Sequence, residues 1–509
     1  MSLPQDLNMH DLPKQPYSSP RLLKWLYCTH RVGSSLALLP YWAIKYALGK
    51  RPRPSWSIRE TLLIDFTRRV SAISDQAGVQ HATRDPTEEP KRDSLKETRF
   101  EWAPGIAGDL CCGVLDDCEV HPLERVGTFI WERAEDVRVD YTRFNDKGTR
   151  EDAGDDASIL SYGQDGGDKG DLVGVYLHGG GYTHFSAHEN AQTSAIPRRL
   201  MEYDYFAAIH AVEYRLLPAS SFPAALQDGI SVYAHLVRAG VPPEKVVFIG
   251  DSAGGNIALA MARWIRDEGK LPAPGGLLLL SPWCDPSRSF PHSTTSYVAR
   301  PNPEDYLADA PAARRLLVTS LLGKKPHEFL TSPYISPASA LGTHGCFNDL
   351  PPTFVHYGDA ERLLDEIDAL VSGMRRDGVE LDVEKTPDAV HDVLMVRFWN
   401  EGVRGHIYER ICGWLDRIVE RSGTPTRSRA ASSASAWQAP AGAPTASAST
   451  SSSPASPRES AGGAGFRRTT PSSDSLAKGK AGGSSDGQAA RTQVIPADEA
   501  GIDSIEEMP

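Results

Sequence analysis

The sequence has few cysteines and lacks the charge pattern that several classes of protein require. Seven cysteines occur in 509 residues, and no two are spaced as CxxC, so neither a zinc site nor a disulfide framework is indicated. The formal net charge of −12 argues against a nucleic-acid-binding protein, which needs a basic surface. Apolar residues make up 40% of the chain, which is slightly lean for a globular protein and predicts a polar segment somewhere.

The chain also has no clean secretory signal. Its first apolar stretch, residues 32–48, is shorter than the roughly 20 residues that span a bilayer, and it contains Pro40 and Lys45. Basic residues flank this stretch on both sides. We expect an amphipathic helix that covers part of the molecule, or alternatively a helix that lies on a membrane surface. The protein is accordingly expected in the cytoplasm or at the periphery of an intracellular membrane such as the endoplasmic reticulum.

Two segments differ sharply in composition from the rest. Residues 423–491 are dominated by Ser, Ala, Pro, Gly and Thr, and such a segment buries too little apolar surface to offset its chain entropy. Residues 146–171 hold eight acidic residues against three basic ones, with several glycines. The first segment is predicted to be disordered, and the second is predicted to be an acidic surface insertion.

Between these segments, apolar strands alternate with helical patterns. This alternation predicts an α/β fold with a mostly parallel sheet that is covered by helices on both faces. Residues 286–348 and roughly the first hundred residues break the alternation and are candidates for a lid. The expected strands cover residues 137–144, 171–178, 205–214, 246–249, 276–282, 352–358 and 379–386, and the expected helices cover 222–240 and 253–267 and end near 376 and 419.

The sequence GDSAG at residues 250–254 joins a predicted strand directly to a predicted helix. In such a turn a serine takes a strained backbone that lifts its hydroxyl above the sheet, and the neighbours two residues away must be glycine. Ser252 is therefore the candidate nucleophile. The N–H of Ala253, at the start of the helix, favours a developing oxyanion. The alternative interpretation is an ordinary glycine-rich turn.

A second glycine run, HGGGY at residues 178–182, follows another predicted strand. The backbone N–H groups of Gly179 and Gly180, together with that of Ala253, are candidates for an oxyanion hole. A phosphate-binding loop is disfavoured because no Lys-Ser/Thr follows and GxGxxG is not formed. His178 is expected to brace this loop rather than to transfer protons.

With YRLLPASSFPAALQD at residues 214–228, these motifs resemble the hormone-sensitive-lipase-like branch of the α/β-hydrolases, in particular its fungal-type esterases and lipases. The middle motif departs from the family pattern at Leu217, Ala219 and Gln227. The resemblance covers about residues 120–420. It implies an α/β-hydrolase fold with an eight-stranded, mostly parallel sheet, a helical lid, and ester hydrolysis through a serine–acid–histidine triad without metal or cofactor.

The resemblance also implies a domain organisation. Residues 1–115 are expected to form an N-terminal segment with a helical lid and a possible membrane-association helix. Residues 116–421 are expected to form the catalytic domain, and residues 422–509 a disordered tail.

A triad of this fold takes its acid and its histidine, in that order, from downstream of the serine. His391 follows the last predicted strand, where the family places its base. The family's acidic motif aligns best with Glu361 in the acid position, although Glu stands where the family has Asp; Asp359 is the rival, with a helix N-cap as its other role. The competing histidines are His292, His327, His344, His356 and His406, and His356 is expected to be a core residue.

The expected function is hydrolysis of lipophilic or short-acyl carboxylic esters by Ser252, Glu361 and His391. A catalytically silent small-molecule receptor is the alternative from another class, and an amidase, deacetylase or acyltransferase is the alternative among enzymes. The oligomeric state stays open. The aromatic candidates for a substrate pocket are Trp25, Trp42, Trp56, Trp283 and Tyr297.

Overall fold

The computed structural model describes six stretches of the chain, all within the unit that ends at Trp437. They cover residues 21–78, 83–133, 170–289, 304–308, 310–341 and 347–423. The predicted strand at residues 137–144, nearly all of the acidic insertion and the tail beyond residue 423 lie outside the described residues.

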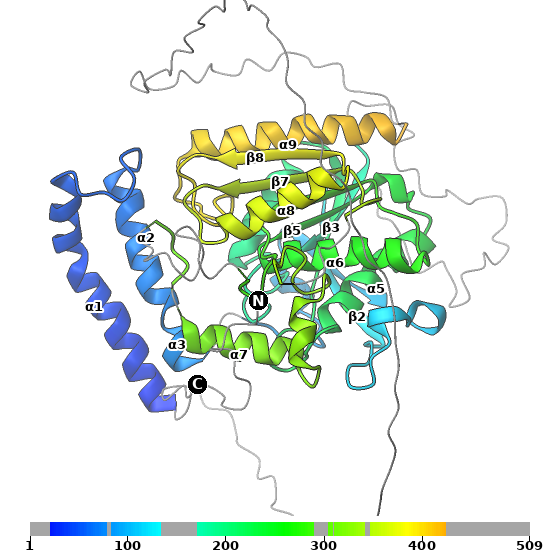
Figure 1. Cartoon of the computed structure of the whole chain (residues 1–509), viewed down its shortest axis with the longest axis horizontal. Coiled ribbons are helices and arrows are strands. Elements are labelled where there is room, and N and C mark those ends of the chain that lie inside the picture. The colour runs from blue at the N-terminus through cyan, green and yellow to red at the C-terminus, as the bar shows by residue number, and fades with distance from the viewer. Residues whose placement is uncertain are drawn as a thin grey trace, which may run out of the picture. The chain divides into compact units, whose positions relative to one another are not determined.

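One eight-stranded sheet forms the centre of the described part (Figure 1). Its strand order is β1-β2-β4-β3-β5-β6-β7-β8; the pairs β1–β2 and β2–β4 are antiparallel, and every later pair is parallel. The expected eight-stranded, mostly parallel sheet is confirmed. The strands are β1 (Thr98–Pro104), β2 (Arg125–Glu132), β3 (Leu172–Leu177), β4 (Phe206–Val212), β5 (Val246–Asp251), β6 (Gly276–Leu280), β7 (Thr353–Gly358) and β8 (Leu381–Thr386).

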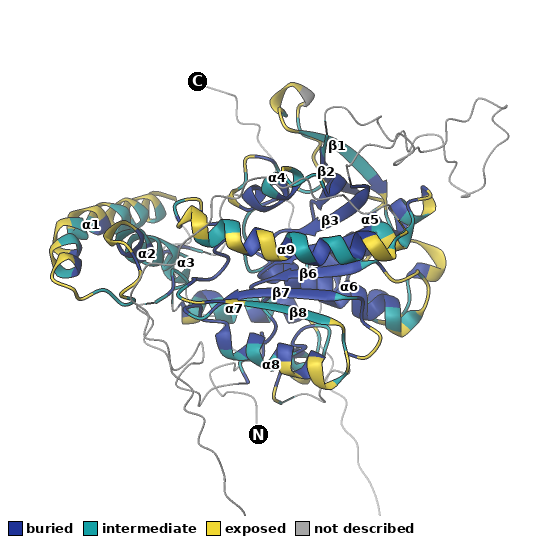
Figure 2. Cartoon of the chain, turned by 90° about the horizontal axis from the view of Figure 1, so that it is seen from above, coloured by how far each residue is buried: buried dark blue, intermediate teal, exposed yellow. Residues whose placement is uncertain are grey.

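Helices cover both faces of this sheet (Figure 2). On one face, α5 (Ala224–Arg238), α6 (Ala253–Glu268) and α8 (Leu364–Arg376) pack against the strands in one apolar cluster. On the other, α4 (Ala195–Met201) and α9 (Glu401–Arg421) belong to a second cluster. Every residue of the strands β3 to β7 is buried, which is why these strands read as continuous apolar runs.

The two regions predicted to lie outside the sheet pack against each other. The N-terminal helices are α1 (Arg21–Ala47), α2 (Ile58–Ser71) and α3 (Ser74–Ala77), and the later region carries α7 (Pro311–Leu322). Asp75 Oδ1 accepts hydrogen bonds from the N–H groups of Ala312 at 2.6 Å and Ala313 at 3.1 Å. Asp75 therefore caps the N-terminus of α7 from α3, because the first N–H groups of a helix have no partner within it.

β1 extends the sheet into the segment 1–115, which the sequence assigned to the lid. It is an edge strand, and its side chains are only partly buried, so it lacks the continuous apolar run of the central strands. Helix α1 begins at Arg21, well before the apolar stretch at residues 32–48. Among the described residues, no helix combines the length and the apolar character needed to cross a membrane.

Candidate active site

Ser252 lies in a sharp turn between β5 and α6. Its backbone has φ 50° and ψ −116°, a strained conformation for a residue with a side chain. A Cβ on Gly254 would lie 1.9 Å from the carbonyl oxygen of Leu177, and one on Gly250 would lie 2.3 Å from that of Gly254. Only glycine fits at these two positions, as expected for a turn that lifts a nucleophile above a sheet.

The structure brings the predicted base and acid to this serine. His391 Nε2 lies 3.0 Å from Ser252 Oγ, and His391 Nδ1 lies 2.8 Å from Glu361 Oε2. The three residues follow the C-terminal ends of β5, β8 and β7. These strands run parallel within the sheet, with β6 between β5 and β7, so their C-terminal ends share one edge. This arrangement is able to transfer the serine proton to the imidazole.

Glu361 is held by further contacts and is fully buried. Its Oε1 accepts hydrogen bonds from the Gly358 N–H at 2.7 Å and from Ser281 Oγ at 3.3 Å. Burial raises the pKa of Glu361 to about 7, against hydrogen bonding and charge interaction with His391, which lower it.

The rival acid, Asp359, faces away from the imidazole. Its Oδ1 accepts a hydrogen bond from the Asp388 N–H at 2.7 Å and lies 3.5 Å from Arg53 Nη1. The following helix begins at Leu364 with Leu363 as its N-cap, so Asp359 is not the cap residue that the sequence suggested.

Of the competing histidines, His356 is a core residue, as predicted. It is buried in β7, and its Nε2 lies 3.2 Å from Thr386 Oγ1. Burial lowers its pKa to about 3. His406 is exposed beside Glu384, and His327 lies in a short 3-10 helix after α7. His292 and His344 lie outside the described residues.

The glycine run after β3 is braced by aromatic packing. The ring of His178 stacks on Tyr214 at 4.3 Å between centroids, and the Tyr214 hydroxyl donates to the His178 carbonyl oxygen at 2.6 Å. Burial lowers the pKa of His178 to about 4, so this ring is neutral at physiological pH. These contacts fit the bracing role expected for His178.

Two of the candidate oxyanion-hole donors lie near Asp251, Gly179 in space and Ala253 two residues along the chain. A Cβ on Gly179 would lie 2.4 Å from Asp251 Oδ2, so the glycine run passes close to the residue before the nucleophile. Helix α6 begins at Ala253, and the Ser252 side chain does not cap it. First-turn N–H groups have no partner within the helix and favour a negative charge. The assignment of Gly179, Gly180 and Ala253 stays a prediction.

One site residue was missed by the sequence reasoning. Asp392 Oδ2 lies 3.1 Å from His391 Nε2, on the side of the imidazole that faces Ser252. The Asp392 N–H donates to Ser281 Oγ at 3.1 Å, and its backbone has φ 44°. Nothing in the sequence signals this contact, because residues adjacent in a chain normally project in different directions and the positive φ is not encoded by a glycine.

The N-terminal segment is tied to the loops that carry the acid and the base. Arg53 Nη1 lies 3.0 Å from Asp388 Oδ1, and its Nη2 lies 3.0 Å from Glu304 Oε2. The Trp56 indole N–H donates to the Asp388 carbonyl oxygen at 2.7 Å. Asp388 stands three residues before His391, and the Arg53 neighbour Asp359 stands two residues before Glu361.

The aromatic residues proposed for a pocket do not gather in one place. Trp25 is 62% exposed on α1, whereas Trp42 and Trp56 are buried. The ring of Trp283 lies 6.3 Å from that of Tyr182, and Tyr297 lies outside the described residues.

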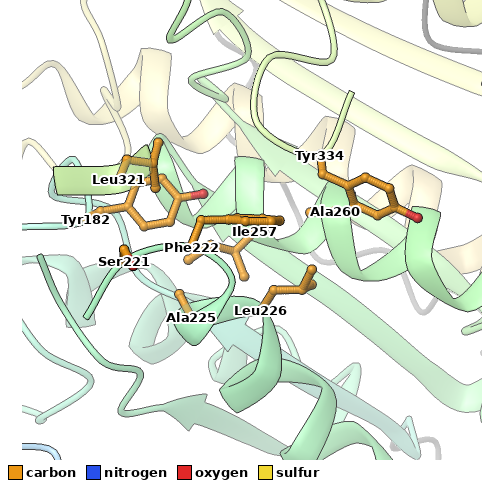
Figure 3. Close-up of a pocket in the computed structure, with 9 residues that line it drawn as sticks. All are labelled: Tyr182, Ser221, Phe222, Ala225, Leu226, Ile257, Ala260, Leu321 and Tyr334. Carbon is orange, nitrogen blue, oxygen red and sulfur yellow. The ribbon is translucent and has the colours of Figure 1, made fainter. Parts of the chain in front are cut away.

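A small apolar cavity of about 10 Å³ lies behind the glycine run (Figure 3). This volume has room for about one water molecule. Tyr182, Phe222, Ile257 and Leu321 are among its lining residues. The Tyr182 hydroxyl donates to Asn256 Oδ1 at 2.7 Å, which fixes the ring of the last residue of the HGGGY motif.

Comparison with known proteins finds a family model that matches less than half of the chain. Residues 174–395 match the family model described as "alpha/beta hydrolase fold". This region is an α/β-hydrolase domain. The α/β-hydrolase fold expected from the sequence is thereby confirmed, and the hormone-sensitive-lipase-like branch and the fungal-type subdivision stay predictions.

The relatives of this α/β-hydrolase include named ester-cleaving proteins. It is 32% identical over 217 residues to "Acetyl-hydrolase" of Streptomyces hygroscopicus, covering 43% of this chain and 66% of that protein. It is 28% identical over 222 residues to "Esterase LipU" of Mycobacterium tuberculosis, covering 43% and 69%. The aligned part of the chain thus spans just under two thirds of the Streptomyces protein.

Among solved structures, a hormone-sensitive lipase from a metagenome library is 26% identical. It aligns with a TM-score of 0.42, over 50% of this chain and 80% of that chain.

Proposed function

We propose that this chain is a serine carboxylic-ester hydrolase in which Ser252, His391 and Glu361 act as nucleophile, base and acid. The observation that carries the proposal is the continuous series of contacts from Ser252 Oγ through both nitrogens of His391 to Glu361. The named esterases and acetyl-hydrolase among its relatives support ester hydrolysis as the reaction.

The reaction proceeds by acyl transfer in two steps. His391 Nε2 takes the proton of Ser252 Oγ while this oxygen forms a bond to the ester carbonyl carbon. The tetrahedral intermediate collapses, the bond to the alkoxy oxygen breaks, and His391 returns the proton to the leaving alcohol. Water then attacks the acyl-enzyme, with His391 again taking and returning a proton, and releases the acid. Glu361 keeps the other nitrogen protonated and stabilises the imidazolium.

The oxyanion of each intermediate is assigned to the N–H groups of Gly179, Gly180 and Ala253. Losing one such donor typically costs about 10²–10³-fold in rate. The position of Ala253 at the uncapped start of α6 supports its part in this assignment.

The proposed substrates are lipophilic or short-acyl esters. The acetyl-hydrolase among the relatives supports a short acyl group. The turnover of p-nitrophenyl acetate and of p-nitrophenyl palmitate separates the two possibilities. Strict preference for the acetate assigns a short-acyl esterase, and comparable turnover of the palmitate assigns a lipase-like enzyme.

Labelling with a fluorophosphonate tests the proposal most directly. We expect the unmodified protein to react covalently and to lose its esterase activity, and we expect Ser252→Ala to do neither. Ser221→Ala, at a serine that lines the small cavity, is the matched control and should still be labelled. Labelling that persists in Ser252→Ala overturns the choice of nucleophile, whereas an unmodified protein that neither labels nor hydrolyses esters points to a receptor.

A further inference from the structure

Helix α1 carries an apolar face that nothing among the described residues covers. Eight of the nine large hydrophobic side chains exposed among these residues lie on α1 or directly after it. Their exposed fractions reach 64% at Ile44 and 72% at Leu48. The eight residues are Leu22, Leu23, Trp25, Leu26, Leu36, Tyr41, Ile44 and Leu48.

The exposed residues follow the helical repeat. Leu22, Leu26, Gly33, Pro40 and Ile44 are exposed and stand three to four residues apart or at multiples of that spacing, so they form one stripe along about 33 Å of helix. Thr29 and His30 are the polar residues among those exposed on this side. Ordinary surface helices present their polar side to water. In α1 it is the apolar side that faces outward.

The inner side of α1 shows why the helix takes this orientation. Ser35, Trp42 and Tyr46 are buried there against α2. The Tyr46 hydroxyl donates to Asp65, and Arg69 Nε donates to Ser35 Oγ at 3.1 Å. These polar contacts fix the rotation of the helix, so the apolar stripe is held outward. Figure 1 shows α1 as the outermost element on its side, with α2 between it and the rest of the described part.

The charged residues in the segment that carries this stripe are all basic. Residues 21–59 contain eight lysines and arginines and no acidic residue, in a chain whose net charge is −12. Arg21 and Lys50 are exposed, one at each end of the helix, and Lys24 is partly exposed. An apolar stripe with exposed Trp and Tyr and flanking basic residues is the pattern of a helix that lies in a membrane interface.

We propose that α1 docks this protein on an anionic lipid surface, with its outward stripe inserted among the acyl chains and its basic residues at the head groups. A single helix presents a convex ridge rather than a groove, which suits a lipid surface. The proposal does not depend on the ester-hydrolase assignment, because docking is measured without turnover.

Flotation of the full chain with vesicles tests this proposal. We expect partition onto phosphatidylcholine vesicles that contain phosphatidylserine, weaker partition onto pure phosphatidylcholine, and loss of the difference at high salt. The triple variant Leu26→Ser, Leu36→Ser, Ile44→Ser should partition at least about tenfold less, since each change removes apolar surface from the lipid. Ile58→Ser, at the exposed hydrophobic residue that lies off α1, is the control and should partition like the unmodified protein.

Three results overturn the proposal. The first is no partition onto either vesicle, and the second is partition that the triple variant does not reduce. The third is a self-associated chain that the triple variant converts to monomer without any lipid binding, which assigns the stripe to a second copy of the chain. All three substituted side chains are exposed, so circular dichroism should show an unchanged fold.

A separate observation concerns the imidazole of the candidate triad. His391 Nε2 faces both Ser252 Oγ at 3.0 Å and the Asp392 carboxylate at 3.1 Å. A neutral imidazole whose Nδ1–H points to Glu361 has only a lone pair at Nε2, and this lone pair repels a carboxylate. A protonated imidazole instead donates on both sides, to Glu361 and to Asp392.

We infer that Asp392 is a positioning residue whose carboxylate, beside His391 Nε2, stabilises the protonated form of the imidazole. Burial lowers the pKa of His391, but the Asp392 and Glu361 carboxylates outweigh it and raise the pKa well above 6.5. Other titratable groups among the described residues also act on this ring or on the Glu361 and Asp392 carboxylates; they include Asp251, Asp305, Tyr306, Tyr176, Glu366, Cys284 and Tyr357. This inference rests on the proposed function, because it assigns His391 as the base.

The base must be neutral to accept the serine proton, so the rate of fluorophosphonate labelling should fall as the pH drops through the pKa of His391. In the unmodified protein we expect this acid limb above pH 6.5. In Asp392→Asn we expect the acid limb of the labelling rate to lie about 1–2 pH units lower, because the substitution removes a negative charge within hydrogen-bond distance of the imidazole. Asp388→Asn removes a carboxylate from the same loop that faces Arg53 instead of the imidazole, and its acid limb should stay in place.

An acid limb at or below pH 6.5 in the unmodified protein overturns the inference without any variant. So does an Asp392→Asn protein that labels more slowly at every pH with an unmoved limb, because that is the signature of a structural role only. Absence of labelling at all pH values is a different result, since it counts against the proposed function itself.

Discussion

At the scale of single residues, two nearby carboxylates have separate partners. Glu361 contacts the imidazole and is fully buried, whereas Asp359 lies two residues earlier and contacts Arg53 and the backbone of Asp388. The sequence left these two candidates open, because both lie in one short stretch after β7. Side-chain direction separates them, and direction is set by the turn after the strand.

The two carboxylates give a matched pair of variants. Glu361→Gln should lower kcat by about 10³–10⁴ with little change in KM, because an amide is unable to stabilise the imidazolium and favours the wrong tautomer. Asp359→Asn should lower kcat less than tenfold. Steady-state kinetics on p-nitrophenyl acetate measure both, and a larger loss in Asp359→Asn than in Glu361→Gln would reverse the assignment of the acid.

Residues that act within a local motif were predictable, and residues that act across the fold were not. Ser252 and its glycines are encoded by a turn of five residues, and His391 follows a recognisable strand. The contacts of Arg53 with Asp388 and Glu304 join residues that are 335 and 251 positions apart. No spacing in the sequence signals such contacts, because they depend on how the N-terminal segment packs against the loops that follow the strands.

At the scale of elements, burial explains only part of what the sequence revealed. Strand β2 is buried from Val126 to Trp131 but was not predicted, whereas the partly exposed β8 was predicted. The central strands β3 to β7 are buried throughout, so their apolar runs stand out and their positions were predicted to within a few residues. The edge strand β1 is partly exposed and contains Arg99 and Glu101 among its apolar residues, so it was not recognised. Edge strands give a weak hydrophobic signal in the sequence because one of their edges contacts solvent rather than another strand.

Helix α1 was recognised only in part for a related reason. Most of its large apolar residues face outward, while its inner side buries Trp42 and Tyr46 and also carries serine and arginine contacts with α2. A pattern search assumes that the apolar side of a helix is the buried one. The apolar stretch at residues 32–48 therefore indicated a helix without indicating which of its sides is buried.

At the scale of the whole molecule, buried neutral histidines couple stability to pH. Burial lowers the pKa of His210 to about 3, of His356 to about 3 and of His178 to about 4. The unfolded chain binds protons at these positions below about pH 6.5, whereas the folded protein does not. The free energy of unfolding is therefore not reduced by these three histidines above pH 6.5, and it decreases as the pH falls from 6.5 toward 3 to 4.

Replacing one of these rings should reduce the acid sensitivity. In both proteins the free energy of unfolding should fall when the pH is lowered from 7 to 4.5. Because His356→Gln removes one buried neutral histidine, its fall should be about 3 kcal/mol smaller than that of the unmodified protein. Urea unfolding at the two pH values measures this difference. His406→Gln, at an exposed ring, should lose as much stability as the unmodified protein. Equal losses in His356→Gln and the unmodified protein would contradict the prediction.

The cap that Asp75 supplies to α7 and the contacts of Arg53 bear on how such enzymes are diversified. Exchanging the N-terminal region alone for that of another family member would leave α7 without its cap and the histidine loop without its guanidinium partner. A chimera designed to inherit a new substrate preference therefore has to carry the matching α7 region and both catalytic loops. In this protein the N-terminal region, the α7 region and the loop of the candidate base are joined by direct contacts, so they have to be exchanged together.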